Sequence, residues 1–173
     1  MSVILGVCGS SCIDGPNAAL IMQKAEQIGR EIAKAGCILL CGGKGGVMEA
    51  VCKGATEEQG LTVGLLPYSK SEANSCVQVP LPTGMGYKRN SLIIESADCI
   101  IAVSGNWGTL NEITFALILG KPVVFLKGSS GFVDLFLQSD FINQIQSDFF
   151  ITENPKEAVE QAVFFAKKAY PKH

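Results

Sequence analysis

The sequence predicts a three-layer α/β domain, in which a mainly parallel sheet is covered by helices on both faces. Short apolar segments of strand character alternate along the chain with helical segments, the order typical of parallel strands joined by crossover helices. The strand segments are apolar on both faces, which indicates that they are buried from both sides. With 173 residues, 47% of them hydrophobic, the chain can bury one core. We therefore expect a single domain that spans residues 1–173.

The N-terminal half begins with a strand and an amphipathic helix. Residues 2–11 are a short, β-rich apolar run that ends in glycine and serine, which favours a strand that enters a loop. Across residues 17–36, apolar side chains recur every three or four positions among charged ones, and a glycine closes the segment, as in an amphipathic helix. Residues 37–43 predict a second strand. A second glycine-terminated helix is expected at 46–60 and a third strand at 61–67.

The C-terminal half continues the alternation. A short strand is expected at residues 75–80 and a helix at 86–97, followed by the strongly apolar strand 98–104. Residues 109–120 predict a helix that ends in glycine, and 121–126 predict another strand. The final helix has three start signals: Asn154 as N-cap, Pro155 as the first helical residue and Glu157 as the capping-box acid.

Composition excludes several classes of function. The net charge is −2 and no run of basic residues exceeds two, so we expect no nucleic acid partner. No apolar stretch reaches the roughly 18–20 residues of a membrane helix, and the start lacks the charged region of a signal peptide, so we expect no membrane partner and a cytoplasmic location. The sole histidine is His173, which excludes Ser-His-Asp triads, Cys-His dyads and histidine-rich metal centres. Any reaction would use arginine, lysine, carboxylates, hydroxyls or backbone amides.

The seven cysteines are expected to be reduced and buried. Their number is odd, their neighbours are mostly apolar, and the chain shows no secretory signal. Two pairs are separated by three residues, and not by the two residues of zinc and redox motifs. We therefore predict small core residues and no metal site: Cys8, Cys12, Cys37, Cys41, Cys52, Cys76 and Cys99.

Three loops rich in small residues follow predicted strands. They are "GSSCIDGPN" at residues 9–17, "CGGKGGVME" at 41–49 and "SGNWGTLNE" at 104–112. Glycine lets backbone N–H groups approach a ligand, and the start of each following helix attracts an anion. Tight turns alone would account for one such loop, but all three should open at the same edge of the sheet. The predicted binding residues are Gly9, Ser10, Gly42, Gly43, Gly45, Gly46, Gly105, Asn106, Trp107, Gly108 and Thr109.

None of these loops is a known triphosphate or dinucleotide motif. Residues 41–49 lack the order of Walker A, and no loop is a G-x-G-x-x-G followed by a ribose-binding acid. The expected partner is therefore a monophosphate or another phosphorylated small molecule.

Two charged residues near the loops each have two interpretations. Arg89 lies at the start of a predicted helix, where the helix dipole disfavours a cation, so it either meets a bound anion or pairs at the surface with Glu95 or Asp98. Glu112 either caps the first turn of its helix or serves as a catalytic acid, and spacing alone favours capping. Glu49 carries the same ambiguity after the loop at 41–49.

Residues 84–112, "GMGYKRNSLIIESADCIIAVSGNWGTLNE", resemble the paired signature of the LONELY GUY or "possible lysine decarboxylase" family. In that family a helix bearing an arginine leads through a strand to P-G-G-x-G-T-x-x-E. The subgroup of molybdenum cofactor carrier proteins is the most similar, because its helix begins with a glycine-rich stretch and "RN". Residues 41–67 also resemble the family, so the likeness covers most of the chain. It implies a Rossmann-like fold and a homo-oligomer, a dimer or a tetramer.

The resemblance assigns roles to individual residues. Arg89 matches the functional arginine and Glu112 the functional glutamate, which the phosphoribohydrolase branch implies to be catalytic. That branch hydrolyses the N-glycosidic bond of a nucleoside 5′-monophosphate, with the G-T turn on the ribose phosphate. A carboxylate aimed at the ribose would stabilise its oxocarbenium-like transition state. Met85 and Asn90, in the glycine-rich "GMGYKRN" stretch, complete the implied ligand site.

Three positions depart from the phosphoribohydrolase pattern. Ser104 replaces the proline, Asn106 the second glycine, and Asn90 the lysine that follows the arginine. These departures favour a carrier that binds a nucleotide or a molybdenum cofactor of molybdopterin type, with no further cofactor required. A phosphoribohydrolase is the alternative, and a lysine decarboxylase is set aside because no pyridoxal-phosphate lysine site is present.

Overall fold

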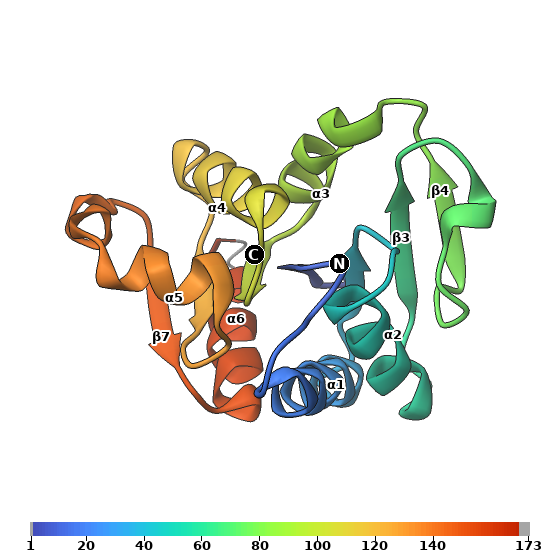
Figure 1. Ribbon diagram of the computed structural model, residues 1–173, viewed down its shortest axis with the longest axis horizontal. Coiled ribbons are helices and arrows are strands. Elements are labelled where there is room, and N and C mark those ends of the chain that lie inside the picture. Colours follow the sequence, from blue (N-terminus) through green and yellow to red (C-terminus); the bar gives the residue numbers. More distant parts are fainter. Residues whose placement is uncertain (1, 170–173) are drawn as a thin grey trace.

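The computed structural model describes residues 2–169, and His173 lies outside them. In the described part, seven parallel strands form one sheet in the order β4-β3-β2-β1-β5-β6-β7, with helices on both faces (Figure 1). The strands are β1 Ile4–Gly9, β2 Ile38–Cys41, β3 Thr62–Leu66, β4 Val79–Pro82, β5 Cys99–Val103, β6 Val123–Leu126 and β7 Phe149–Thr152. The helices are α1 Ala18–Lys34, α2 Val47–Glu57, α3 Asn90–Ser96, α4 Trp107–Ile118, α5 Gly131–Gln138 and α6 Pro155–Ala169, with 3-10 turns η1 Lys70–Glu72, η2 Gly86–Arg89 and η3 Asp140–Gln144. The predicted single-domain, Rossmann-like α/β fold is confirmed.

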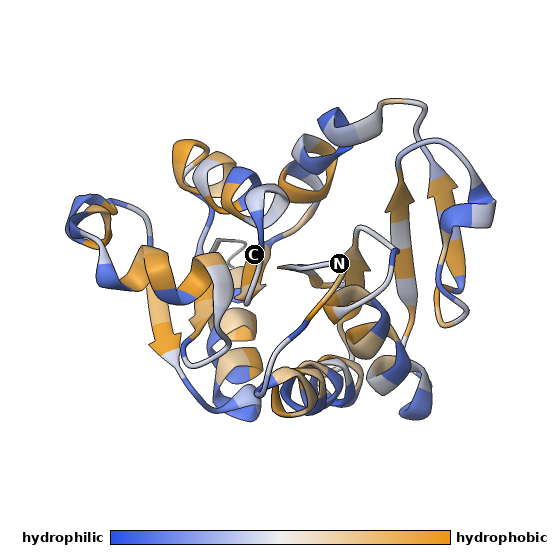
Figure 2. Ribbon diagram, in the orientation of Figure 1, coloured by the Kyte–Doolittle hydropathy of each residue, from blue (hydrophilic) through white to orange (hydrophobic). Residues whose placement is uncertain are grey.

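The core has two parts, one on each face of the sheet. Side chains of α1, α2 and α6 cover one face, and those of α3, α4 and α5 cover the other. Strand β5 contributes to both parts and is buried along its whole length, as its continuous apolar sequence predicts. Figure 2 shows apolar residues concentrated in the strands, while the helices carry both apolar and polar residues.

Sequence reasoning missed α5 and β7 and misplaced β4. The predicted strand at 75–80 begins instead at Val79, because residues 74–78 form a turn in which the Asn74 side chain accepts the N–H of Cys76. Strand β7 is a short edge strand, and pairing with β6 defines it.

The start of α6 confirms two of its three predicted signals. Asn154 accepts the backbone N–H of Lys156 at 2.9 Å, and Pro155 is the first helical residue. The capping-box role of Glu157 is wrong, since its carboxylate accepts the hydroxyl of Thr152. That Thr152 hydroxyl itself accepts the N–H of Asn154 at 3.0 Å, and so takes the donor that the box would have used.

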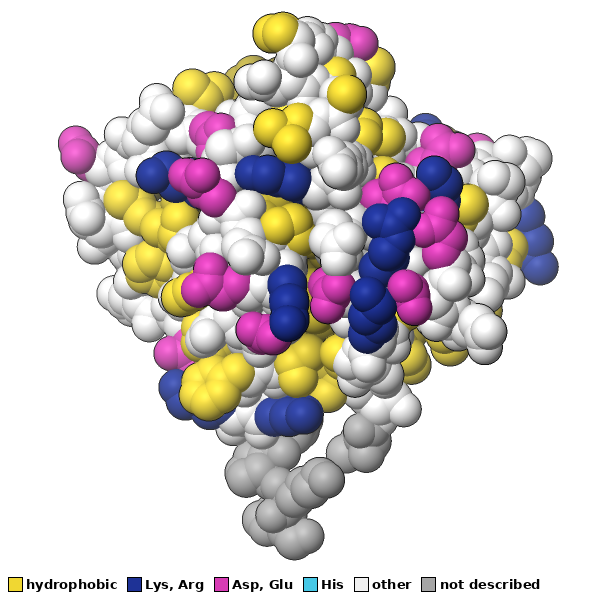
Figure 3. Space-filling view, turned by 90° about the horizontal axis from the view of Figure 1, so that it is seen from below, with side chains coloured by type: hydrophobic (Ala, Val, Ile, Leu, Met, Phe, Trp, Pro, Cys, Tyr) yellow, Lys and Arg dark blue, Asp and Glu magenta, His cyan; other side chains and the backbone are white. Residues whose placement is uncertain are grey.

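The contact between α1 and α2 depends on two helical glycines. A β-carbon at Gly29 would collide with the carbonyl oxygen of Val51, and one at Gly54 with that of Glu26. At the surface of the same contact, Arg30 of α1 forms ion pairs with Glu26 of α1 and Glu57 of α2. In the view of Figure 3, cations and carboxylates are interleaved on the face seen from below.

Replacing Gly29 with alanine is expected to destabilise the protein by about 1–3 kcal/mol, although alanine is the better helix former. The two backbones would have to separate to admit the methyl group. Urea denaturation measures the change, with Gln23→Ala on the exposed side of the same helix as the control. A Gly29→Ala protein more stable than wild type would show that the helices do not approach this closely.

The connections that follow the two central strands, β1 and β5, lead to opposite faces of the sheet. The connection after β1 leads to α1 on one face, whereas the connection after the adjacent β5 leads to α4 on the other. Loops that diverge in this way leave a crevice at the carboxyl ends of the two strands, where ligands of open α/β sheets bind. None of the helices in residues 2–169 is long and apolar enough to cross a membrane.

Five of the seven cysteines are buried, and all seven are free thiols. The prediction of buried cysteines is wrong for Cys12, which is exposed in the loop after β1, and for Cys76, which is half-buried in the turn before β4. No group of three or more potential metal ligands occurs among the described residues.

Candidate functional site

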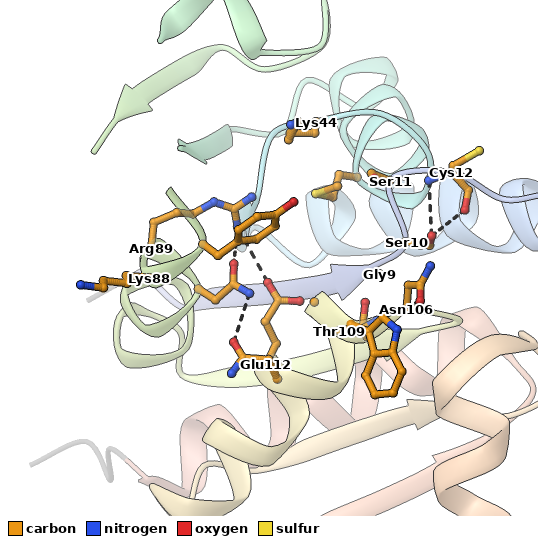
Figure 4. Close-up of a pocket in the computed structure, with 16 residues that line it drawn as sticks. Gly9, Ser10, Ser11, Cys12, Lys44, Lys88, Arg89, Asn106, Thr109 and Glu112 are labelled. Atoms are coloured by element: carbon orange, nitrogen blue, oxygen red, sulfur yellow. Dashed lines mark hydrogen bonds and ion pairs between the residues drawn. The ribbon is translucent and has the colours of Figure 1, made fainter. Parts of the chain in front are cut away.

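A cavity of about 750 Å³ opens at the carboxyl ends of β1 and β5, at the crevice described above. Four segments line it: the loop after β1, the loop after β2 with the start of α2, the 3-10 turn η2 with the start of α3, and the first turns of α4. Figure 4 shows side chains from these segments converging on the same space. Nine predicted residues are in the lining: Gly9, Ser10, Arg89, Asn90, Asn106, Trp107, Gly108, Thr109 and Glu112.

Six predicted residues do not line the cavity: Gly42, Gly43, Gly45, Gly46, Met85 and Gly105. The glycines of the loop after β2 serve close packing instead. Gly46 has a φ of 64° and lies against the backbone of Ser10 and Ser11, where a β-carbon would collide. Gly42 lies beneath the guanidinium of Arg89, with no room for a side chain. These glycines therefore support the site from outside the lining.

Seven residues of the lining were not predicted: Ser11, Cys12, Lys44, Met48, Tyr87, Lys88 and Asn111. All lie within two residues of a predicted one. A search for glycines overlooks such side chains. Their types add two cations and an aromatic ring to the cavity.

Arg89 is the buried cation of the site. Only 7% of it is exposed, and its guanidinium donates to Asn90 Oδ1 at 3.0 Å and to the Gly42 carbonyl at 3.3 Å. Its Nη1 lies 3.8 Å from Glu112 Oε1. Its Nε is buried with no hydrogen-bond partner among the described residues. The interpretation of Arg89 as a surface residue paired with Glu95 or Asp98 is therefore wrong.

Asn90 and Asn111 extend this cluster along the cavity wall. The side-chain amide of Asn90 donates to Asn111 Oδ1 at 3.2 Å while its oxygen accepts from Arg89. Asn90 therefore fixes the guanidinium from a position where the phosphoribohydrolase pattern has a lysine. Asn111 is exposed and faces the cavity.

Glu112 is a buried carboxyl and not a cap. It is the sixth residue of α4, and the first turn is capped by Asn106, whose side chain accepts the N–H of Trp107 at 3.0 Å. The capping interpretation is therefore wrong. Burial raises the pKa of Glu112 to about 8, and the nearby Arg89 offsets only part of that effect. Burial also lowers the pKa of Arg89, against the opposing influence of Glu112. Exposed Glu49 is not in the lining.

The loop from Ser104 to Asn106 is held by a segment that the sequence did not identify. Ser129 Oγ accepts the N–H of Ser104 at 2.7 Å and donates to the Leu126 carbonyl at 2.6 Å. The Phe132 N–H donates to the Gly105 carbonyl at 3.0 Å. Ser104 itself has a φ of 55°. A proline at Ser104 could neither adopt this angle nor donate the hydrogen bond, so serine there is a structural change from the family motif.

Comparison with known proteins agrees with the resemblance in the sequence. The model of the SLOG cluster4 family matches residues 2–160. The chain is 30% identical over 165 residues to the cytokinin riboside 5′-monophosphate phosphoribohydrolase LOG of Oryza sativa subsp. japonica. That match covers 90% of this chain and 66% of the rice protein.

Among the solved structures that are similar, two molybdenum cofactor proteins match nearly the whole chain. The molybdenum cofactor binding protein of the phototrophic bacterium Rippkaea orientalis has a TM-score of 0.83 and 34% identity, over 93% of this chain and 95% of that one. The Moco carrier protein of Chlamydomonas reinhardtii has a TM-score of 0.83 and 30% identity, over 97% and 99% of the two chains. The family match and the two structures therefore confirm both the Rossmann-like fold and the predicted resemblance to the family.

Proposed function

This chain belongs to the SLOG cluster4 family, and on that premise we propose that it binds a phosphorylated small molecule in the cavity and acts as a carrier. The observation that carries the proposal is Arg89, a buried cation that belongs to the cavity lining. A buried cation is stabilised by an opposite charge. A phosphate oxygen is a strong acceptor for the N–H groups of a guanidinium.

The rest of the lining has the charge that an anion requires. Arg89, Lys44 and Lys88 are its cations, and Glu112 is its one acidic side chain. Because the pKa of Glu112 is about 8, that carboxyl is mostly protonated at neutral pH and opposes an anion little. The first turn of α4 adds N–H groups and the positive end of a helix dipole beside Thr109.

The proposed ligand is a nucleotide or a cofactor of molybdopterin type. The cavity is large enough for either, since small-molecule sites enclose about 300–1,000 Å³. The names of the two similar structures support the pterin, and that of the rice relative supports the nucleotide. Both ligands combine a phosphate with a flat heteroaromatic ring.

Thermal unfolding with a small panel of compounds tests the proposal. A ligand at about 100 times its Kd adds ~2.7 kcal/mol to the free energy of unfolding and so raises Tm. We expect AMP, ribose 5-phosphate and a pterin monophosphate to raise Tm, and adenosine, which lacks the phosphate, to have little effect. An unchanged Tm with every phosphorylated compound, or an equal rise with adenosine, contradicts the proposal.

The second candidate is hydrolysis of a nucleoside 5′-monophosphate, and the raised pKa of Glu112 favours it. Carboxyl groups with such shifts, next to a cation in a cavity, are typical of acid–base catalysts. In this mechanism the Glu112 carboxylate stabilises the oxocarbenium-like ribose and orients the attacking water, while Arg89 holds the phosphate. The C–N bond breaks, and water supplies the hydroxyl of ribose 5-phosphate and the proton of the free base.

Chromatography of an AMP incubation separates the two candidates. A carrier leaves AMP intact, whereas a hydrolase releases equal amounts of adenine and ribose 5-phosphate and leaves adenosine untouched. Because the carboxylate is the active form in this mechanism, the rate should rise with pH towards a plateau above about 8. A rate that Glu112→Gln leaves unchanged would exclude Glu112 from the chemistry.

A further inference from the structure

Trp107 is an exposed aromatic ring in the lining of the cavity. It is the first residue of α4, and 74% of it is exposed. Its ring packs on that of Phe132, with centroids 4.8 Å apart and planes at 53°. One side of the indole is therefore supported by protein, while most of its surface is open next to the anion-binding residues.

Phe132, which supports the Trp107 ring, also holds the loop before α4 in place. The Phe132 N–H donates to the Gly105 carbonyl, and Gly131 packs so closely on Gly105 that a β-carbon there would collide with the Gly105 carbonyl oxygen. The Asn106 side chain accepts the backbone N–H of Trp107. These contacts fix the backbone from which the indole projects, and Phe132 supports the ring itself.

A second exposed aromatic residue comes from another wall of the cavity. Tyr87, in η2, is 88% exposed and lies two residues before Arg89. Large exposed aromatic side chains beside a buried cation are not needed for folding, since neither ring is removed from water. They are the groups on which flat heteroaromatic rings stack.

We propose that Trp107, supported by Phe132, is the stacking surface for the flat ring of the ligand. This inference rests on the proposed function, in which the phosphate of the same ligand lies at Arg89 and the start of α4. It assigns recognition of the base or pterin to Trp107 and recognition of the phosphate to other residues. Trp107 is thus a specificity residue, selecting phosphate esters that carry a flat ring over those that do not.

The chain provides its own probe, because Trp107 is its sole tryptophan. Titrations of the intact protein would follow tryptophan fluorescence and, in parallel, calorimetric affinity. We expect AMP and 6-hydroxymethylpterin monophosphate to quench the fluorescence through stacking, and ribose 5-phosphate to bind without quenching. We expect AMP to bind about tenfold more tightly than ribose 5-phosphate, the gain typical of one stacked ring.

Replacing Trp107 with leucine should remove that preference. AMP affinity should fall about tenfold while ribose 5-phosphate affinity stays the same, and Trp107→Phe should keep most of the preference. Phe164→Leu, at an exposed aromatic residue of α6 outside the lining, is the matched control and should change neither affinity.

The outcomes separate this inference from the proposed function. If Trp107→Leu weakens both ligands equally, or leaves the preference for AMP intact, the stacking role is wrong and phosphate binding stands. If the wild-type protein binds neither AMP nor ribose 5-phosphate nor the pterin phosphate, both proposals are overturned.

Discussion

Replacing Arg89 with methionine is expected to weaken the binding of ribose 5-phosphate about 100-fold, or ~3 kcal/mol, with little loss of folded protein. Methionine keeps much of the apolar length of the side chain but removes the charge and every donor. The loss corresponds to one or two charge-assisted hydrogen bonds made in a buried site. Isothermal titration calorimetry with ribose 5-phosphate measures it directly.

The fold should tolerate this change because the partner of Arg89 can lose its charge. Without the guanidinium 3.8 Å away, the pKa of Glu112 rises further, and the carboxyl stays protonated at neutral pH. Circular dichroism should therefore show a native spectrum for Arg89→Met at pH 7.

Arg30 provides a matched control for Arg89, since these are the two arginines of the chain. Arg30→Met removes ion pairs with Glu26 and Glu57 on α1 and α2, outside the cavity lining, and should leave ligand affinity unchanged. Arg89→Lys should bind more weakly than wild type, because an ammonium group cannot make the same fork of hydrogen bonds. Equal affinities for wild type and Arg89→Met would place the phosphate elsewhere.

Replacing Glu112 with glutamine is expected to flatten the pH dependence of stability. The pKa of Glu112 is about 8 in the folded protein, against an ordinary value of 4.5. Between these values the folded protein holds a proton that the unfolded chain has released. The contribution of this group to the free energy of unfolding therefore falls as pH rises from about 4.5 to 8, and is level outside that window. The full span is at most about 5 kcal/mol.

Glutamine has no proton to lose, so the Glu112→Gln protein should lack this decline. Urea denaturation at pH 5.5, 7 and 9 should show the variant close to wild type at the lowest pH and more stable by several kcal/mol at the highest. Exposed Glu49, at the corresponding place after the earlier loop, provides the control Glu49→Gln, which should parallel wild type. A Glu112→Gln curve parallel to that of wild type would mean that Glu112 is ionised at neutral pH.

The sequence predicted the parts of the site that lie on single segments. The glycine loops after β1 and β5 and the helix with Arg89 were identified, and their convergence followed from the rule for parallel sheets. The roles of the glycines after β2 were not identified. In a sequence, a glycine that binds an anion cannot be distinguished from one that allows a neighbouring backbone to pack closely. Only the close approach of Ser10 and Ser11 to Gly46 distinguishes them.

The order of most strands and helices was determined by the sequence itself, because local periodicity and glycine stops specify them, whereas α5 and β7 were missed. The tertiary structure decided the burial and the protonation of Arg89 and Glu112. Glu112 and Arg89 are 23 residues apart, and sequence spacing left each with two interpretations. Folding buries both beside one cavity. Burial, which no local pattern encodes, raises the pKa of Glu112 and leaves the Nε of Arg89 without a partner among residues 2–169. Ser129 and Phe132 likewise hold the α4 loop through contacts between segments distant in the chain.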